Sequence, residues 1–225
     1  MITFSWMYLF NRLAGYTEKD LNKRGKSPIG LAREKYPRPS VEELSNTLSL
    51  PNTIGFLIAR NPYERLVSGY REKILGAIRG SPHDKLGKDI VIKYRKLDPR
   101  QYKWGKTFPT FTEFVRYILD EVNLGNTLDM HWTPVNDFCT PCQVNLNHII
   151  KFETFDRDTM HILKHSRLTE YLPPTEKTLK KNVSKGKQNS SSLVETYLDE
   201  LPPDLRKNLY DLYRIDFDLF GYKPP

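Results

Sequence analysis

The sequence predicts an α/β fold with a central parallel sheet flanked by helices. Two short apolar runs support this prediction, at residues 54–59 and 148–152, and helical spacing follows each of them. A continuous apolar run of this length is typical of a strand that is buried on both faces, as in parallel sheets. The chain has 225 residues, which suits one compact core, so we expect a single domain over residues 1–225.

The first forty residues contain a short predicted helix and a long loop. Apolar residues at helical spacing predict a helix over residues 6–13, which Gly15 can end as a C-cap. Residues 17–40 are polar and basic with several glycines and prolines, so we expect a loop with one helical turn at 29–35. The chain opens on apolar residues without a basic leader, and we expect it to be a fragment or a shortened gene model.

The strand at 54–59 leads directly into the best-defined predicted helix of the chain. Asn61 can act as its N-cap, Pro62 as its first residue and Glu64 as the reciprocal member of a capping box. Five apolar residues then share one face of this helix: Tyr63, Leu66, Val67, Tyr70 and Ile74.

Weaker patterns cover the remainder of the chain. We expect a surface excursion over residues 79–106, which are charged, and a helix over 111–119 capped by Thr110 or Thr112. A further helix is predicted near residues 156–165.

The C-terminal part should contain a loop and then ordered structure. Residues 177–192 are basic and serine-rich, which predicts a mobile loop. Residues 205–213 are amphipathic, and residues 215–222 alternate apolar and acidic side chains, as a segment docked on the core would.

The net charge predicts an anionic partner. Lysine and arginine number 35 against 27 acidic residues, a formal charge of +8. Such a surface attracts nucleic acid, sulfated glycans, nucleotides or acidic membranes. A basic nucleic-acid-binding protein would fit the charge, but the sequence carries no recognition-helix, RNP or zinc-finger motif.

An anion site is predicted where the strand at 54–59 meets the following helix. Arg60 lies at the end of the strand, and the helix that begins at Pro62 directs its amides and its dipole toward the same crevice. Arg60 can grip a phosphate with two hydrogen bonds, Ser68 can add a hydroxyl, and Arg65 adds positive potential. The alternative is that these residues are solvated positions on an ordinary amphipathic helix.

Several motifs together resemble one known family. The pattern Arg60-Asn61-Pro62-x-x-Arg65-x-x-Ser68 after an apolar strand resembles the 3'-phosphate-binding motif of Golgi carbohydrate sulfotransferases of the chondroitin, dermatan and HNK-1 type. Further segments match this family in order: His131-Trp132-x-Pro134, Cys139-x-Pro141-Cys142, Lys151-Phe152-Glu153-Thr154, and the C-terminal run from Leu209 to Tyr222. The resemblance spans nearly the whole chain.

This resemblance implies a P-loop-like sulfotransferase fold and a donor substrate. The donor would be 3'-phosphoadenosine 5'-phosphosulfate (PAPS), whose 3'-phosphate Arg60 and Ser68 would hold, with Arg65 nearby. The acceptor would be a glycan hydroxyl, with no nucleic acid and no metal involved. The full-length protein would be a type II membrane protein of the Golgi lumen, attached only through an anchor that this chain lacks.

The family's second donor motif looks incomplete in this sequence. It comprises a strand and a loop in which a lysine precedes small and hydroxyl residues, then tryptophan and a helix. Thr3, Ser5 and Trp6 occupy the corresponding place, but the strand and the lysine are missing and Phe4 replaces a small residue. A cation there would stabilise the charge that develops on the leaving oxygen. The alternative function is therefore an inactive or weak relative that binds nucleotide or glycan.

The acceptor hydroxyl needs a general base, and His131 is the first candidate because it lies in a matching block and titrates near neutrality. Glu34 and Glu153 are alternatives, and a purely structural His131 remains open. Ser184 and Lys185 lie in the basic loop where family members close over the nucleotide. Cys139 and Cys142 fit a local disulfide or two buried thiols better than a zinc site with His131 and His148.

Overall fold

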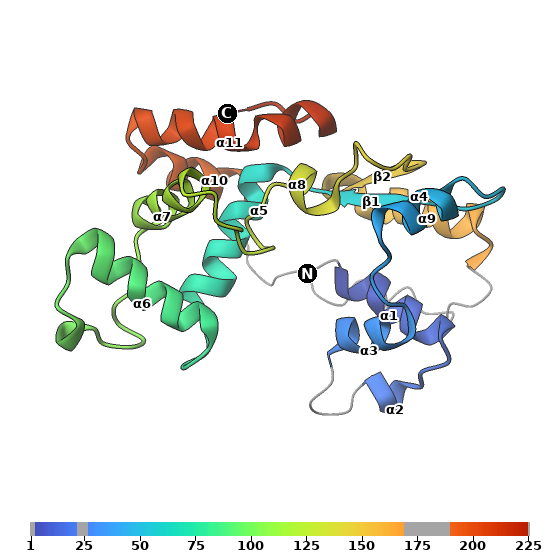
Figure 1. Ribbon diagram of the computed structural model, residues 1–225, viewed down its shortest axis with the longest axis horizontal. Coiled ribbons are helices and arrows are strands. Elements are labelled where there is room, and N and C mark those ends of the chain that lie inside the picture. The colour runs from blue at the N-terminus through green and yellow to red at the C-terminus, as the bar shows by residue number, and fades with distance from the viewer. Residues whose placement is uncertain (1–2, 22–26, 169–189, 225) are drawn as a thin grey trace. The chain divides into compact units, whose positions relative to one another are not determined.

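The computed structural model describes residues 3–21, 27–168 and 190–224 (Figure 1). The chain divides into two compact units, each made of two stretches of sequence. Unit 1 comprises Met1–Leu57 and Gln143–Lys187, and unit 2 comprises Ile58–Cys142 and Gln188–Pro225. Across the described ranges, every helix falls short of the length and apolar character that a bilayer crossing requires. The single domain over residues 1–225 stays a prediction.

Unit 1 is mainly helical. Its elements are α1 (Thr3–Leu13), α2 (Glu18–Leu21), α3 (Pro28–Lys35), α4 (Val41–Leu48), strand β2 (His148–Lys151), the 3-10 turn η3 (Phe152–Thr154) and α9 (Phe155–His165). The expected helical turn at 29–35 is confirmed as α3, which Ser27 caps by accepting the Gly30 amide. Helix α4 was missed in the sequence, although Ser40 and Glu43 form a complete capping box at its start.

The described residues contain a small parallel sheet. Strand β1 (Phe56–Ala59) pairs in parallel with β2, and both strands lie where they were predicted. The Gly55 carbonyl accepts hydrogen bonds from the amides of Asn147 and His148 at the start of this pairing. Within the described residues this sheet has two strands. The parallel pairing is confirmed, whereas a central sheet flanked by helices stays a prediction.

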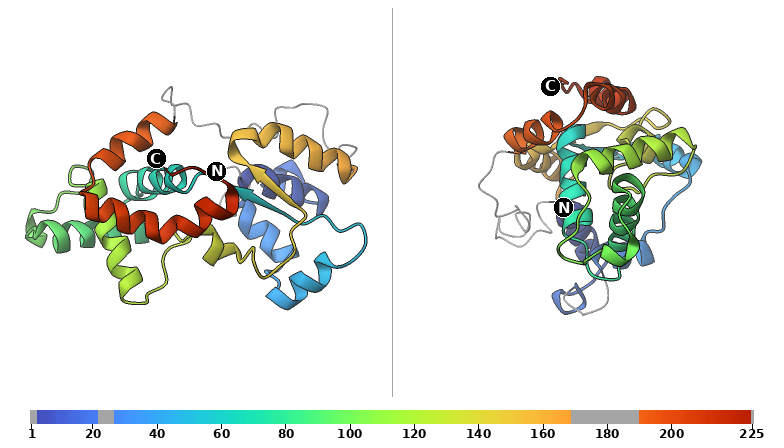
Figure 2. Two further views of the ribbon diagram at one scale, coloured as in Figure 1. Left: turned by 90° about the horizontal axis from the view of Figure 1, so that it is seen from above. Right: turned by 90° about the vertical axis from the view of Figure 1, so that its left-hand side faces the viewer.

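Unit 2 is a helical assembly around one apolar core. Its elements are α5 (Pro62–Gly69), the π-helical turn η1 (Tyr70–Leu75), α6 (Pro82–Arg95), the 3-10 turn η2 (Pro99–Gln101), α7 (Phe111–Asn123), α8 (Val135–Cys139), α10 (Ser190–Asp199) and α11 (Pro203–Phe220). Helices α10 and α11, far away in sequence, pack on α5, and α11 also packs on α7 (Figures 1 and 2).

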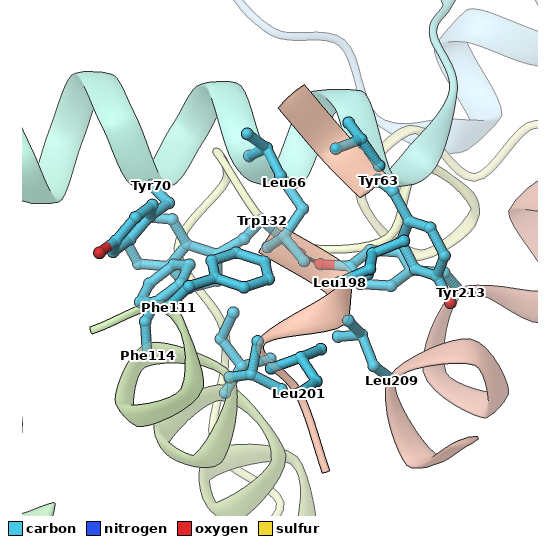
Figure 3. Packing of buried hydrophobic residues seen from close by; sticks show 14 of the residues in the cluster. Tyr63, Leu66, Tyr70, Phe111, Phe114, Trp132, Leu198, Leu201, Leu209 and Tyr213 are labelled. Carbon is cyan, nitrogen blue, oxygen red and sulfur yellow. Dashed lines mark hydrogen bonds between the residues drawn. The ribbon is translucent and has the colours of Figure 1, made fainter. Parts of the chain in front are cut away.

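The apolar face predicted for α5 forms the centre of this core. Tyr63, Leu66 and Tyr70 are each at most 3% exposed and belong to one buried cluster (Figure 3). The Tyr63 ring packs against Tyr213 and Phe217 of α11. Tyr70 packs against both Phe111 and Phe114 with ring centroids 5.3 Å apart. Burial of this face fixes the rotation of α5, so its polar residues point in defined directions.

Two segments that were not predicted to be helical belong to helices. Residues 79–106 contain the 14-residue helix α6, capped by Ser81, and Ile90 and Val91 from this helix are buried. Residues 215–220 continue α11, where Asp216, Phe217 and Phe220 are buried. In both helices only a narrow face is buried, so many charged side chains lie between the apolar ones. The helical spacing of the apolar residues was therefore not recognised in the sequence. Residues 177–189 of the predicted loop lie outside the described residues.

Candidate active site

Arg60 and Ser68 lie on one side of α5. The Arg60 side chain donates Nε–H to the Glu64 carboxylate over 3.2 Å, which places the guanidinium beside the first turn of the helix. Glu64 and Ser68 are four residues apart on α5, so they share a helix face. The Arg60 head group and the Ser68 position are therefore about one helical turn apart, roughly 5.4 Å along the axis. Both side chains are half-buried.

The start of α5 differs from the predicted anion site in one respect. Asn61 accepts hydrogen bonds from the amides of Tyr63 at 3.0 Å and Glu64 at 3.3 Å, and Pro62 has no amide hydrogen. The amides of the first turn are therefore already satisfied by the cap. Glu64 bonds to Arg60 and does not complete the expected capping box. An anion at this position would be bound by side chains and not by helix amides.

Arg65 has a different task from its neighbours in the motif. Its guanidinium donates hydrogen bonds to the Thr133 carbonyl at 2.5 Å and the Met130 carbonyl at 2.7 Å. These carbonyls belong to residues 129–136, which we call the His131 turn. Two charge-assisted hydrogen bonds to backbone oxygens hold the guanidinium on this turn. Arg65 thus lies against protein backbone in this structure, and a contact with the nucleotide stays a prediction.

Helix α11 holds the His131 turn from a second direction. The Tyr213 hydroxyl, which is buried, donates a hydrogen bond to the Trp132 carbonyl. The Asp216 carboxylate, 1% exposed, accepts the amides of Val135 at 2.6 Å and Asn136 at 2.8 Å. Burial raises the pKa of Asp216, and these two amides oppose that shift. The C-terminal signature therefore caps α8 and fixes the turn that carries His131.

Gly69 lets α5 approach the same turn closely. A methyl group on Gly69 would lie 3.2 Å from the His131 carbonyl oxygen and 3.7 Å from its Cβ. The absence of a side chain therefore allows the backbone of His131 to rest on the helix. Arg65 and Gly69 make one face of α5 a support for the turn, and Ser68, three residues after Arg65, borders this face.

A carboxylate orients the His131 ring. Asp129 Oδ1 lies 2.5 Å from His131 Nδ1 and also accepts the His131 amide at 2.8 Å. Hydrogen bonding to a carboxylate places the ring proton on Nδ1, which leaves the Nε2 lone pair able to accept a proton. Burial lowers the pKa of His131, and the hydrogen bond and charge of Asp129 oppose this shift without cancelling it. The neutral, basic form of the ring is thus favoured.

Asp129 bonds a second imidazole as well. His83, at the start of α6, places Nε2 3.1 Å from Asp129 Oδ2. Burial raises the pKa of Asp129, but the hydrogen bonds from His131 and His83 outweigh this and keep the pKa below its usual value. Neither Asp129 nor His83 was predicted from the sequence to belong to the site. The spacing of Asp129 two residues before His131 permits the local turn, but nothing in the sequence pointed to His83, 46 residues away.

The residues expected from the incomplete second motif lie in unit 1. Thr3 and Ser5 occupy the first turn of α1, and Trp6 follows them with an exposed fraction of 1%. The Trp6 ring packs on Phe56 with centroids 4.5 Å apart and on Phe10 at 5.7 Å, so it is a core residue of this unit. Its role in binding the donor stays a prediction.

Six further residues were singled out in the sequence as candidates for the site or for a cysteine pair. Glu34 and Glu153, the alternative bases, belong to unit 1, whereas His131 belongs to unit 2. Ser184 and Lys185 lie outside the described residues. Cys139 and Cys142 form no disulfide, and Cys142 is exposed with Sγ 3.7 Å from the Asn136 side-chain oxygen.

The chain is similar in sequence to several carbohydrate sulfotransferases. Relatives include carbohydrate sulfotransferase 11 of Rattus norvegicus, 27% identical over 83% of this chain and 51% of the relative. Carbohydrate sulfotransferase 14 of Danio rerio is 33% identical over 76% of this chain and 44% of the relative. Carbohydrate sulfotransferase 9 of Homo sapiens is 30% identical, over 75% and 37% respectively.

The matches cover most of this chain but a smaller share of each relative. The chain spans about half the length of the curated relatives it matches, or less. No solved structure matches it significantly. The model of the family described as "Sulfotransferase family" matches residues 2–223, nearly the whole sequence. The chain therefore belongs to the sulfotransferase family.

Proposed function

We propose that this chain transfers a sulfuryl group from PAPS to a hydroxyl group of a glycan by in-line displacement. The observation that carries the proposal is the position of α5. Arg60, just before this helix, and Ser68, on it, lie about one helical turn apart, and the same helix supports the His131 turn through Arg65 and Gly69. A donor-binding motif and a histidine with an orienting carboxylate therefore belong to the same compact unit.

Arg60 and Ser68 bind the 3'-phosphate of the donor in this proposal. A guanidinium and a hydroxyl one helical turn apart can both reach the oxygens of one phosphate group. The Glu64 carboxylate holds the Arg60 side chain over the helix and limits the freedom that binding would otherwise remove. Because the first-turn amides are capped by Asn61, the proposal relies on these side chains for discrimination between PAPS and nucleotides without a 3'-phosphate.

His131 acts as the general base. Its Nε2 takes the proton of the acceptor hydroxyl as the acceptor oxygen forms its bond to sulfur. The bond between sulfur and the phosphate oxygen breaks at the same time, and adenosine 3',5'-bisphosphate leaves. Asp129 keeps the ring in the correct tautomer and stabilises the imidazolium that forms, as carboxylates do beside catalytic histidines. Glycan acceptors and residence in the Golgi lumen are part of the same proposal, supported by the names of the relatives and the family resemblance.

The test is transfer of labelled sulfate from PAPS to chondroitin-type acceptors by the purified chain. The proposal expects labelled glycan and stoichiometric adenosine 3',5'-bisphosphate. Nucleotide binding without any turnover, for a folded protein and across sulfated and unsulfated glycan acceptors, would contradict the enzymatic role and favour a binding protein.

A further inference from the structure

The proposed base His131 and two neighbouring side chains form a group of three potential metal ligands. One ligand atom from each of His83, Asp129 and His131 lies within 4.8 Å of the other two. The nitrogens that face the Asp129 carboxylate are His83 Nε2 and His131 Nδ1. We call these residues the His–Asp–His cluster. The side chains keep exposed fractions of 24%, 33% and 34%, so an ion from solvent can reach them. Cys139 and Cys142 are not part of the cluster.

We propose that the His–Asp–His cluster binds a zinc ion, or a similar divalent transition metal, and that the bound ion switches off the base. The second half of this proposal rests on the proposed function, whereas the binding site itself does not. No metal was expected from the sequence, where a zinc site of Cys139, Cys142, His131 and His148 was the arrangement considered. The ligands of the His–Asp–His cluster come from α6 and from the His131 turn and form no compact sequence motif.

The donor set fits this class of ion. Two imidazole nitrogens and one carboxylate oxygen suit zinc and its neighbours, whereas calcium and magnesium prefer oxygen ligands alone. Zinc bonds to these atoms are about 2.0–2.2 Å long, so ligand atoms around one ion lie roughly 3–3.5 Å apart. His83 Nε2 and Asp129 Oδ2 are already 3.1 Å apart. Three protein ligands leave a further position for water.

The surroundings hold the ligands in place. The His131 turn is fixed by Arg65, Tyr213 and Asp216, and the His131 amide anchors Asp129 Oδ1. The buried Trp132 ring supports the His83 ring with centroids 5.9 Å apart. Such preorganisation limits the entropy lost on binding. The ammonium group of Lys73 acts electrostatically on His131 and opposes a cation, whereas the Asp129 carboxylate favours one.

Metal binding and base catalysis exclude each other at His131. In the metal-free cluster the ring proton lies on Nδ1, facing Asp129, and the Nε2 lone pair accepts a proton from the acceptor. An ion on Nδ1 requires that nitrogen to be unprotonated, so the single proton of the neutral ring moves to Nε2. The Nε2 atom then has no lone pair for the acceptor. No proton is gained or lost overall, and the exchange reverses when the ion leaves.

The binding test is a cobalt titration of the full chain. The protein is stripped with a chelator and titrated with Co²⁺, visible absorption reports coordination, and Zn²⁺ is then added as a competitor. We expect one tight site that His83→Ala weakens by at least about tenfold, since loss even of an outer partner of a metal ligand costs that much. Equal affinity in the wild type and in His83→Ala would overturn the site. His83→Gln provides a second variant if the alanine variant does not fold.

A matched control comes from a different histidine pair. His161 and His165 are four residues apart on α9, with stacked rings whose centroids are 6.2 Å apart, and such a pair can bind transition metals weakly. The His161→Ala variant should keep the tight Co²⁺ site. Loss of the tight site in this variant would assign it to α9 and overturn the proposal.

The switch is tested by the ratio of transfer rates with and without Zn²⁺. At a Zn²⁺ concentration that just saturates the wild type, we expect the wild-type rate to fall at least about tenfold and the His83→Ala rate to fall clearly less. Tight Zn²⁺ binding with an unchanged or increased wild-type rate would overturn the switch but not the site. If the wild type shows no transfer at all, the proposed function fails, and the Co²⁺ titration still decides whether the site exists.

Discussion

The two segments expected to bind the donor, α5 and the start of α1, match the family motif to different degrees and are used differently by the fold. At α5 the motif residues have different contacts: Arg60 pairs with Glu64, whereas Arg65, together with the adjacent Gly69, lies against the His131 turn. On α1 the one matching residue with a described side chain, Trp6, is buried against Phe56. A motif match therefore locates a segment, but contacts decide which of its residues face a ligand.

The largest effect is expected at His131, the proposed base on the turn that α5 supports. His131→Ala should lower the rate of sulfate transfer by about a hundredfold to ten-thousandfold, the usual contribution of a general base, and leave affinity for adenosine 3',5'-bisphosphate unchanged. Initial-rate kinetics and nucleotide titration measure the two quantities. The matched control is His161→Ala on α9, which should transfer at the wild-type rate. A folded His131→Ala variant with an unchanged rate would exclude His131.

The role of α11 in holding the turn predicts a large loss of stability. Asp216→Ala leaves the buried amide of Val135 and the partly buried amide of Asn136 without an acceptor, which should lower the free energy of unfolding by about 3 kcal/mol. Urea unfolding measures this value. Asp218→Ala on the same helix is exposed and should change the free energy of unfolding by less than about 0.5 kcal/mol. Similar losses for both variants would show that Asp216 does not hold the turn.

A substitution of Arg65 tests whether this side chain supports the His131 turn or binds the nucleotide. Arg65→Lys cannot reproduce both hydrogen bonds to the Met130 and Thr133 carbonyls, so we expect a loss of about 2 kcal/mol in the free energy of unfolding and a lower kcat. Affinity for adenosine 3',5'-bisphosphate should stay constant, as it should in the exposed control Arg71→Lys. A selective loss of nucleotide affinity in Arg65→Lys would move this residue back to the donor site.

Gly69 offers the smallest and most local perturbation. Gly69→Ala places a methyl group 3.2 Å from the His131 carbonyl, so the turn must shift by a few tenths of an ångström. We expect a loss of kcat of about threefold to tenfold, because small displacements of a catalytic group are costly. Gly87→Ala on α6, where the nearest atom is 3.7 Å away, is the control and should keep the wild-type kcat. Equal rates for both variants would mean that α5 does not position His131.

Local sequence signals predicted the elements better than their assembly. The β1–α5 junction followed from an apolar run and from Asn61 and Pro62, because caps and strand ends are encoded by neighbouring residues. Helix α6 and the end of α11 were missed because their charged residues interrupt the apolar pattern. The contacts of Arg65 and the pairing of His83 with Asp129 join residues 46 to 68 positions apart, and no local pattern encodes such distances.

The central claim is that Arg60, just before α5, and Ser68, on α5, recognise the 3'-phosphate of the donor, and one binding experiment tests it most directly. Affinities of the wild type and of Arg60→Ala are measured for adenosine 3',5'-bisphosphate and for adenosine 5'-phosphate. Loss of a charge-assisted hydrogen bond should weaken binding of the bisphosphate about tenfold to a hundredfold and leave the monophosphate nearly unaffected, with a smaller selective loss in Ser68→Ala. Equal weakening of both nucleotides would contradict the assignment.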